Sequence, residues 1–368
     1  MNILFLLTQL ETGGAQTRVI QTVEQLRRNG NSVDLAFLYK KRDCFSDVDK
    51  IILSKRAGLM RPIEAIFNLF KLLRSKRYDA VVTNTAPANI IGNSVALLCG
   101  VKGRVAYQTQ PPQRLQSVYR ILDAVLGTLS VYRKNIVNSE WTKSCFDGYP
   151  NSYRAKLRLL YDGITPPPST TTKREAREIL GLPQDRYLIL NVGRLSAQKD
   201  QETLIRAMAT VDGHLLIAGD GELATQLNSL ADKLAPGKVT FLGELPREKL
   251  GTYFAAADTF AFSSRWETFG LALVEAAAHQ MPLVVTDLPV SREVLAINSE
   301  AMPQSPRTTF VTPGDSVSFA RELNTARAAA LSFPRTKDPT VCSVFTIEYH
   351  TGRLLEICSA AVGGPRAE

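Results

Sequence analysis

Short apolar runs alternate along the chain with longer segments of helical periodicity. In the first part, the runs "NILFLL" at 2–7, "SVDLAFL" at 32–38 and "DAVVTN" at 79–84 are separated by helical patterns near 15–29 and 62–75. Runs rich in Leu and β-branched residues that alternate with helices are typical of βαβ units with a mostly parallel sheet. The pattern therefore predicts an α/β fold.

The alternation stops and then starts again after residue 180. The segment "TPPPSTTTK" at 165–173 combines three prolines with several hydroxyl residues, which disfavours a core element. Five further apolar runs follow it, namely "YLILNVGR", "HLLIAG", "VTFLG", "TFAFSS" and "PLVVT". We therefore expect two α/β domains, covering 1–165 and 166–343. Ligands of open α/β sheets bind beyond the carboxyl ends of the strands, so two facing domains would place the site in a cleft.

Length and composition fit a globular protein of two domains. The chain has 368 residues, of which 45% are hydrophobic. Its five cysteines form no C-x-x-C pair, which argues against a disulfide framework and a zinc site and favours a reducing, cytoplasmic compartment. The apolar start "MNILFLL" has neither a basic leader nor a small-residue cleavage site, so we interpret it as a buried strand.

Positive charge is concentrated in the first half. The net charge is +9, but residues 1–165 contain 24 Lys and Arg against 12 Asp and Glu, whereas the remainder contains 20 against 23. A basic half indicates nucleic acid, an anionic membrane or an anionic substrate as a partner. Because no zinc-finger, RRM or helix-turn-helix motif accompanies the charge, we expect no nucleic-acid partner.

Two stretches of the basic half are amphipathic. The segments 61–77 ("RPIEAIFNLFKLLRSKR") and 114–134 ("RLQSVYRILDAVLGTLSVYRK") carry apolar residues at helical spacing beside Lys and Arg. Each is either a surface helix that packs on the sheet or a helix that lies on an anionic membrane. The sequence leaves both alternatives open.

Two loops that follow predicted strands carry candidate anion-binding groups. Gly13 and Gly14 stand at a strand-to-helix turn, where small residues and backbone N–H groups admit an anion, although a tight turn needs the same residues. Arg194 and Lys199 of "NVGRLSAQKD" follow another strand. A planar guanidinium and a compact ammonium suit a diphosphate, although solvated loop charges are common.

Two glutamates stand eight residues apart in the apolar stretch "SSRWETFGLALVEAAAHQMP" at 263–282. Glu267 falls in the loop after a predicted strand, and Glu275 falls in the second turn of a helix that begins near Gly270. The backbone N–H groups of Phe269, Gly270 and Leu271 suit a phosphate. Carboxylates on either side suit neutral hydroxyl groups, as on a sugar or a ribose. For Glu267 the alternative is an acid that only stabilises the helix start.

These segments together resemble a known enzyme family. "GGAQT", "GRLSAQKDQETLIRA", "LLIAGDGE", "VTFLGEL" and the stretch from "YFAAADTF" to "PLVVTD" have the order and spacing of the retaining glycosyltransferases of family four, most strongly over 181–295. The resemblance implies the GT-B fold, with two facing Rossmann-like domains, parallel sheets and a cleft between them. It also implies that 344–368 forms a helix that crosses back to the first domain.

The resemblance implies a role for each candidate residue. Arg194 and Lys199 would bind the donor diphosphate, and Glu267 would bind hydroxyls of the transferred sugar, so these three are the expected catalytic residues. The expected substrate-binding residues are Gly13 and Gly14 near the phosphates, Phe269, Gly270 and Leu271 at the helix start, Glu275 at the ribose, and Glu293 at a matching acidic position. Such enzymes retain the anomeric configuration and generally need neither a metal nor another cofactor.

One departure from the family concerns a strand end in the first domain. Many members carry a His there, but this chain reads "VAYQTQPPQ", which makes Gln108, Thr109 or Gln110 the substrate-binding candidate. The replacement would alter the choice of sugar or lower the activity. His279 replaces a small residue of the family pattern, and we expect it to be structural or exposed.

We therefore expect a cytoplasmic enzyme, peripheral on the inner membrane, that acts in cell-surface glycan synthesis such as lipopolysaccharide or exopolysaccharide. It would transfer a sugar from a nucleoside diphosphate sugar, with UDP assumed, to a lipid-linked or growing polysaccharide acceptor. The alternatives are a transferase with a soluble acceptor and a nucleotide-sugar-binding protein with weakened catalysis. A dehydrogenase is disfavoured, because no G-x-G-x-x-G motif with a downstream acid follows a strand.

Overall fold

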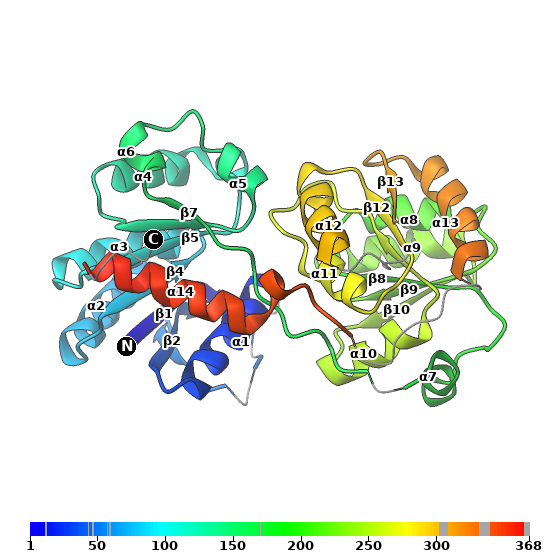
Figure 1. The fold of residues 1–368 in the computed structure, drawn as a ribbon, viewed down its shortest axis with the longest axis horizontal. Coiled ribbons are helices and arrows are strands. Elements are labelled where there is room, and N and C mark those ends of the chain that lie inside the picture. The colour runs from blue at the N-terminus through cyan, green and yellow to red at the C-terminus, as the bar shows by residue number, and fades with distance from the viewer. Residues whose placement is uncertain are drawn as a thin grey trace. The chain divides into compact units, whose positions relative to one another are not determined.

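The chain forms two compact units (Figure 1). The computed structural model describes residues 1–363 except 12, 43, 46, 47, 57, 59, 170, 302–307 and 331–338. Unit 1 comprises Met1–Ile164 and Val344–Glu368, and unit 2 comprises Thr165–Ser343. Unit 2 is therefore an insertion between two parts of unit 1.

Unit 1 is built on a seven-stranded parallel sheet in the order β3-β2-β1-β4-β5-β6-β7. In the central pairs, Phe5 of β1 lies opposite Leu35 of β2 and Val82 of β4. The strands are β1 (Asn2–Leu10), β2 (Ser32–Lys40), β3 (Ile51–Ser54), β4 (Ala80–Asn84), β5 (Gly103–Gln108), β6 (Lys134–Val137) and β7 (Leu157–Leu159).

Helices cover both faces of this sheet. The helices of unit 1 are α1 (Gly14–Arg28), α2 (Met60–Ser75), α3 (Ala86–Leu98), α4 (Ser117–Thr128), α5 (Glu140–Ser144), α6 (Asn151–Arg154) and α14 (Ile347–Val362), with a 3-10 turn at Pro112–Arg114. Helices α1 and α14 pack side by side on one face, whereas α2, α3 and α4 follow one another on the other (Figure 1). Side chains of β1 alternate between these two cores, which explains why the run "NILFLL" is apolar without a gap.

The second amphipathic stretch differs from the sequence prediction. Only Ser117–Thr128 is helical, because Ser130 turns the chain with a positive φ of 63° and β6 begins at Lys134. Val131 and Tyr132 are buried in the turn and belong to the core rather than to an amphipathic helix.

Helix α14 is fixed to the rest of unit 1 by a buried polar cluster. Arg18 of α1 donates from Nε to Asp162 Oδ1 at 3.0 Å, and its guanidinium lies 3.9 Å above the centroid of the Tyr107 ring. The Tyr107 hydroxyl donates to Asp162 Oδ1 at 2.6 Å. His350 of α14 bonds through Nδ1 to the Tyr161 carbonyl at 2.8 Å. These contacts join the last helix to segments far earlier in the chain.

Unit 2 has a six-stranded parallel sheet in the order β10-β9-β8-β11-β12-β13. Its strands are β8 (Leu188–Val192), β9 (His214–Ala218), β10 (Val239–Gly243), β11 (Thr259–Phe262), β12 (Leu283–Thr286) and β13 (Thr308–Val311). Its helices are α7 (Lys173–Leu180), α8 (Gln201–Ala207), α9 (Ala224–Leu234), α10 (Arg247–Ala256), α11 (Leu271–Ala278), α12 (Pro289–Ala301) and α13 (Ser316–Ala330). Two hydrophobic cores flank the sheet, one under α8, α9 and α13 and the other under α10, α11 and α12. The predicted α/β fold with parallel sheets is confirmed.

Candidate functional site

Candidate side chains gather at the carboxyl ends of two neighbouring strands of unit 2. Strands β8 and β11 pair in parallel, so the loops that follow them start at the same edge of the sheet. The loop after β8 carries Lys199, and the loop after β11 carries Glu267. This edge is where open α/β sheets bind their ligands.

Lys199 and Glu267 form an ion pair between these two loops. Glu267 is 6% exposed, and the Ser264 hydroxyl donates to its Oε1 at 2.8 Å. The Lys199 stem runs across Gly193, where a β-carbon would lie 3.3 Å from Lys199 Cδ. The two charges are therefore held in defined positions at the strand ends, with the Lys199 side chain still 21% exposed.

Helix α11 begins directly beyond Glu267. Gly270 is its N-cap residue and has a φ of 94°, a left-handed conformation that favours glycine, and no side chain caps the helix. Phe269 is buried and Leu271 is the first helical residue. The backbone N–H groups at such a start attract anions, because they lack intrahelical acceptors and lie at the positive end of the helix dipole.

Glu275 lies on the second turn of α11 and is buried. Burial raises the pKa of Glu275, and the nearby Arg247 guanidinium opposes this shift. Arg247, the first residue of α10, donates from Nη1 to Glu275 Oε1 at 3.1 Å. Arg247 was not predicted, because its segment "LPREKL" follows no recognisable pattern and only the fold brings it to Glu275.

Arg194 and Glu293 occupy more peripheral positions in unit 2. The Arg194 guanidinium contacts Glu222 through Nε at 3.2 Å, and both side chains are largely exposed. Its backbone carbonyl accepts a bond from Gln201 Nε2 at 3.0 Å, which helps to shape the loop after β8. Glu293 is half-buried on α12, the helix that packs against α11. Lys199 and Glu267 are thus the catalytic candidates that the structure brings into direct contact.

The candidates in unit 1 lie at two strand ends. Gly13 is the N-cap residue of α1, and Gly14 is its exposed first residue. Thr109 is half-buried and Gln110 is exposed in the loop after β5. Their contact with a ligand stays a prediction.

Gln108 has a structural role instead of the predicted ligand contact. It is 2% exposed, and its Nε2 donates to Asp123 Oδ1 at 3.0 Å and to Asn135 Oδ1 at 3.1 Å. Because the amide is used inside the unit, Gln108 is not free to reach a substrate. Thr109 and Gln110 remain the candidates for this position.

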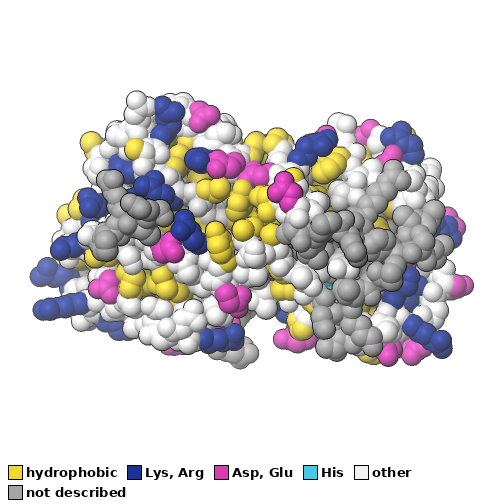
Figure 2. All heavy atoms as spheres, viewed as in Figure 1, with side chains coloured by type: hydrophobic (Ala, Val, Ile, Leu, Met, Phe, Trp, Pro, Cys, Tyr) yellow, Lys and Arg dark blue, Asp and Glu magenta, His cyan; other side chains and the backbone are white. Residues whose placement is uncertain are grey.

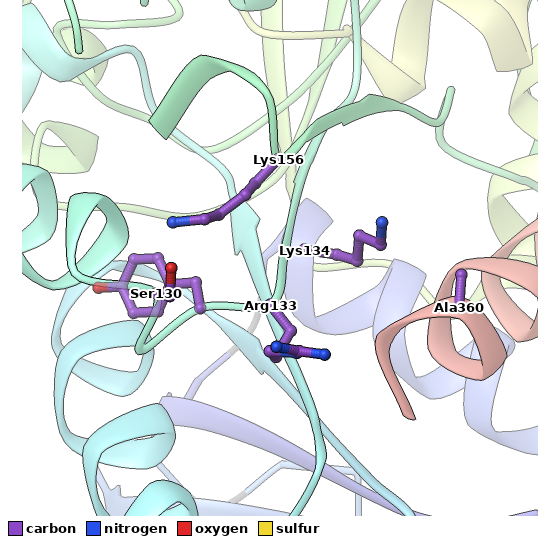
Figure 3. Close-up of a pocket in the computed structure, with 6 residues that line it drawn as sticks. Ser130, Arg133, Lys134, Lys156 and Ala360 are labelled. Carbon is purple, nitrogen blue, oxygen red and sulfur yellow. The ribbon is translucent and has the colours of Figure 1, made fainter. Parts of the chain in front are cut away.

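A basic pocket in unit 1 lies away from the expected ligand edge (Figure 3). It is lined by Ser130, Tyr132, Arg133, Lys134, Lys156 and Ala360. Residues 130–134 precede or start β6 and Lys156 precedes β7, so the pocket lies at the amino ends of these strands. Lys156 Nζ bonds the carbonyl of Gly127 at the end of α4, and in Figure 3 the three cationic side chains point apart. We therefore do not assign the donor site here.

Among the residues in the described ranges, no three His, Cys, Asp or Glu side chains are grouped so that they could hold a metal ion. Within the same part of the chain, no helix combines the length and the apolar character needed to cross a bilayer.

The family and the relatives that match this chain are glycosyltransferases. The family described as "Glycosyl transferases group 1" matches residues 172–326. An uncharacterized glycosyltransferase of Methanocaldococcus jannaschii is 34% identical over 307 residues, which cover 77% of this chain and 79% of that protein. The UDP-Gal:alpha-D-GlcNAc-diphosphoundecaprenol alpha-1,3-galactosyltransferase of Escherichia coli is 25% identical over 255 residues, 64% of this chain and 65% of the relative.

Solved structures show the same fold at low sequence identity. The Anabaena protein HepE in complex with UDP and glucose has a TM-score of 0.79 at 19% identity, covering 98% of this chain and 100% of the other. WaaG, a glycosyltransferase involved in lipopolysaccharide biosynthesis, has a TM-score of 0.69 at 16% identity, with coverage of 98% and 100%.

Proposed function

Because this chain belongs to the group 1 glycosyl transferases and has the GT-B type of fold, we propose that it transfers the sugar of a UDP-sugar to a lipid-linked acceptor with retention of configuration and releases UDP. The observation that carries the proposal is the Lys199–Glu267 pair at the carboxyl ends of β8 and β11, next to the start of α11. A growing polysaccharide is the alternative acceptor for the same reaction.

The pair suits a donor whose diphosphate is the leaving group. In the proposed complex, Lys199 and the N–H groups at the start of α11 bind the diphosphate, and Arg194 approaches from the loop after β8. Positive groups fixed where negative charge develops lower the barrier, because they need no reorganisation during the reaction. These groups would supply the charge that a metal supplies in other enzymes, so we propose that transfer is metal-independent.

Glu267 is proposed to bind the transferred sugar. Its Oε1 accepts from Ser264 Oγ at 2.8 Å and pairs with Lys199. A phosphate would attract the Lys199 ammonium, and this would leave Glu267 able to accept bonds from sugar hydroxyls. Glu275 is proposed to accept bonds from the ribose hydroxyls further along α11.

The acceptor proposal draws on one relative and on the surface of unit 1. The Escherichia coli relative carries a name that specifies a UDP-sugar donor and a diphosphoundecaprenol-linked acceptor. An enzyme with such an acceptor must work at a membrane surface, and unit 1 exposes side chains that suit one.

Exposed apolar side chains gather on α2, α3 and α4. Among the described residues, fifteen large hydrophobic side chains are exposed, and twelve lie on these helices or at the end of α4. We call this the three-helix face: Met60, Ile63, Ile66, Phe67, Phe70, Leu97, Leu98, Val118, Ile121, Leu122, Val125 and Leu129. The helices contact one another in the order α2, α3, α4, so the side chains belong to one side of the unit.

Basic residues accompany the three-helix face. Lys71, Arg74, Arg77, Lys102 and Arg120 are exposed on or beside its helices. Figure 2 shows Lys and Arg side chains gathered along the edge of unit 1 that α2 and α3 form. The acids of the same helices have partners within the unit or are buried: Glu64 is half-buried and accepts from Ser54 Oγ at 2.7 Å, and Asp123 is buried. We propose that this face rests on an anionic membrane, where apolar burial and charge attraction add.

A donor panel followed by product analysis tests the proposed function. Thermal shift with UDP-, GDP- and ADP-sugars should give the largest stabilisation with a UDP-sugar, since a ligand at 100 times its Kd stabilises by about 2.7 kcal/mol. Incubation with an undecaprenyl diphosphate-linked sugar should yield an α-linked product from an α-linked donor by NMR. Transfer to a water-soluble glycoside alone would favour the soluble-acceptor alternative, and binding without turnover would favour the nucleotide-sugar-binding alternative.

A further inference from the structure

Unit 2 is joined to unit 1 by a first connection at segment 165–168 and a second connection after Thr340, and both are bonded to α11, the helix that carries Glu275. At the first connection, His279 at the end of α11 bonds through Nε2 to the Pro167 carbonyl at 3.0 Å. At the second connection, the Thr340 N–H donates to the Ala278 carbonyl at 3.0 Å. The last turn of α11 therefore holds both connections within unit 2.

The first connection, segment 165–168, packs closely on unit 2, although its three prolines predicted no core element. Pro167 is buried. A β-carbon at Gly251 of α10 would lie 1.9 Å from the Pro168 carbonyl oxygen, so the absence of a side chain there permits the approach. His279 is 6% exposed and stacks on Phe254, with ring centroids 4.7 Å apart and an interplanar angle of 9°. Segment 165–168 is thus part of the packed structure of unit 2.

Arg247 joins this segment to Glu275. Its Nη2 donates to the Thr165 carbonyl, and its Nη1 donates to Glu275 Oε1 at 3.1 Å. A guanidinium is rigid and planar, so a displacement at one nitrogen moves the other. The side chain is 31% exposed, whereas the Glu275 side chain is 10% exposed. One cation therefore links the proposed ribose ligand to the first residue of the connection.

We propose that Arg247 is a positioning residue that couples occupancy of the nucleotide site to the conformation of segment 165–168. The inference rests on the proposed role of Glu275 as the ribose ligand. Ribose hydroxyls that donate to the Glu275 carboxylate compete with Arg247 for it and weaken the hydrogen bond from Arg247 Nη1 to Glu275 Oε1. The guanidinium then shifts, and its bond to Thr165 shifts with it. By linkage, the conformation of the segment changes the nucleotide affinity by the same factor.

The test compares Arg247→Lys with the wild-type protein and with Arg247→Ala. Lys keeps a positive charge for Glu275 but has one nitrogen, so it cannot bridge as a guanidinium does. UDP affinity is measured by calorimetry, and the radius of gyration of the full chain is measured by small-angle X-ray scattering with and without saturating UDP. Arg206→Ala is the matched control, because Arg206 forms an exposed ion pair with Glu202 within α8.

The wild type and Arg206→Ala should bind UDP and change their radius of gyration, because segment 165–168 joins the two units. Arg247→Lys should lose this change in radius. Its UDP affinity should stay within about tenfold of the wild type, since tenfold is an ordinary size for the coupling that it loses. Arg247→Ala should bind UDP more weakly, because buried Glu275 loses its cation. A full change in radius in Arg247→Lys, or UDP binding by the wild type without any change, would overturn the coupling alone. A wild-type protein that binds no nucleoside diphosphate would overturn the proposed function and this inference together.

Discussion

Lys199 and Glu267 form a largely buried ion pair that joins the loops after two neighbouring strands of unit 2. Such a pair is costly to break on one side only, because the remaining charge is left without its partner. A diphosphate that binds Lys199 replaces the carboxylate by a stronger anion and leaves Glu267 for the sugar. The two residues should therefore act as a unit in binding and in turnover.

The first prediction follows from this pairing. Lys199→Ala and Glu267→Ala should each lower kcat/KM by about 10²–10³-fold, the usual effect of losing one charge-stabilising group. The double variant should lose less than the product of the two effects, since each single variant already disables the pair. Steady-state kinetics on the best donor measure this. Full additivity would mean that the pair is not a functional unit, and Arg206→Ala serves as the control for loss of a surface ion pair.

The second prediction concerns Glu275. Glu275→Gln should weaken UDP binding by about 10–100-fold, because a bond to a charged acceptor contributes about 1.5–3 kcal/mol. Burial raises the pKa of Glu275, so acidification should protonate it and weaken UDP binding in the wild type, whereas the Gln variant should lose this component of the pH dependence. Calorimetry between neutral and mildly acidic pH measures both effects. An unchanged Kd in the variant would remove Glu275 from the ribose site.

The third prediction concerns the three-helix face. Ile63 and Phe67 of α2 are 58% and 67% exposed. Changing both to Ser should weaken binding to phosphatidylglycerol vesicles by about 30-fold, since partial burial of each side chain contributes about 1 kcal/mol. Added salt should also weaken vesicle binding by the wild-type protein, because it screens the basic residues. Vesicle flotation measures both.

Val317→Ser is the control for the face variant. Val317 is 77% exposed on α13 of unit 2, so the change removes a comparable apolar side chain at another place. Equal loss of vesicle binding in both variants would contradict a specific face, and wild-type protein that stays with the soluble fraction at low salt would contradict membrane binding altogether.

The fourth prediction concerns acid stability of unit 1. Burial lowers the pKa of His350 to about 4, with a further contribution from Arg18, which Asp162 and the Tyr161 carbonyl oppose. Well above pH 6.5 the imidazole is neutral in the folded and in the unfolded chain, so this group does not make the free energy of unfolding depend on pH. As the pH falls toward 4, the unfolded chain takes up the proton first. The free energy of unfolding should therefore fall by about 2 kcal/mol by pH 5 from this group.

His350→Asn should remove that part of the acid destabilisation. An Asn amide can still donate toward the Tyr161 carbonyl, so the variant retains one bond of the cluster without a titrating group. Urea denaturation at pH 7.5 and pH 5 gives the comparison. The same loss of stability between the two pH values in wild type and variant would show that other groups dominate.

The sequence predicted most of what depends on local pattern. The strand-end loops with Lys199 and Glu267 and the helix that carries Glu275 were predicted, because each follows from apolar periodicity and from a turn. Gln108 was assigned wrongly, because a strand-end amide looks the same in sequence whether it faces a ligand or, as here, Asp123 inside the unit. Arg247 was missed because its partners Glu275 and Thr165 are distant in the sequence. Long-range pairs of this kind depend on the fold and carry no local signal.

The insertion of unit 2 into unit 1 has a consequence for biosynthesis. Leu354, Ile357, Cys358 and Ala361 of α14 belong to the same core as Phe5 of β1. A nascent chain that has reached residue 343 contains all of unit 2 but lacks this helix, so the apolar surface that α14 covers beside α1 stays exposed while unit 2 is made. Domains generally fold as units during synthesis. Here the unit that begins first is completed last, so unit 1 reaches its full core only after unit 2 has been made.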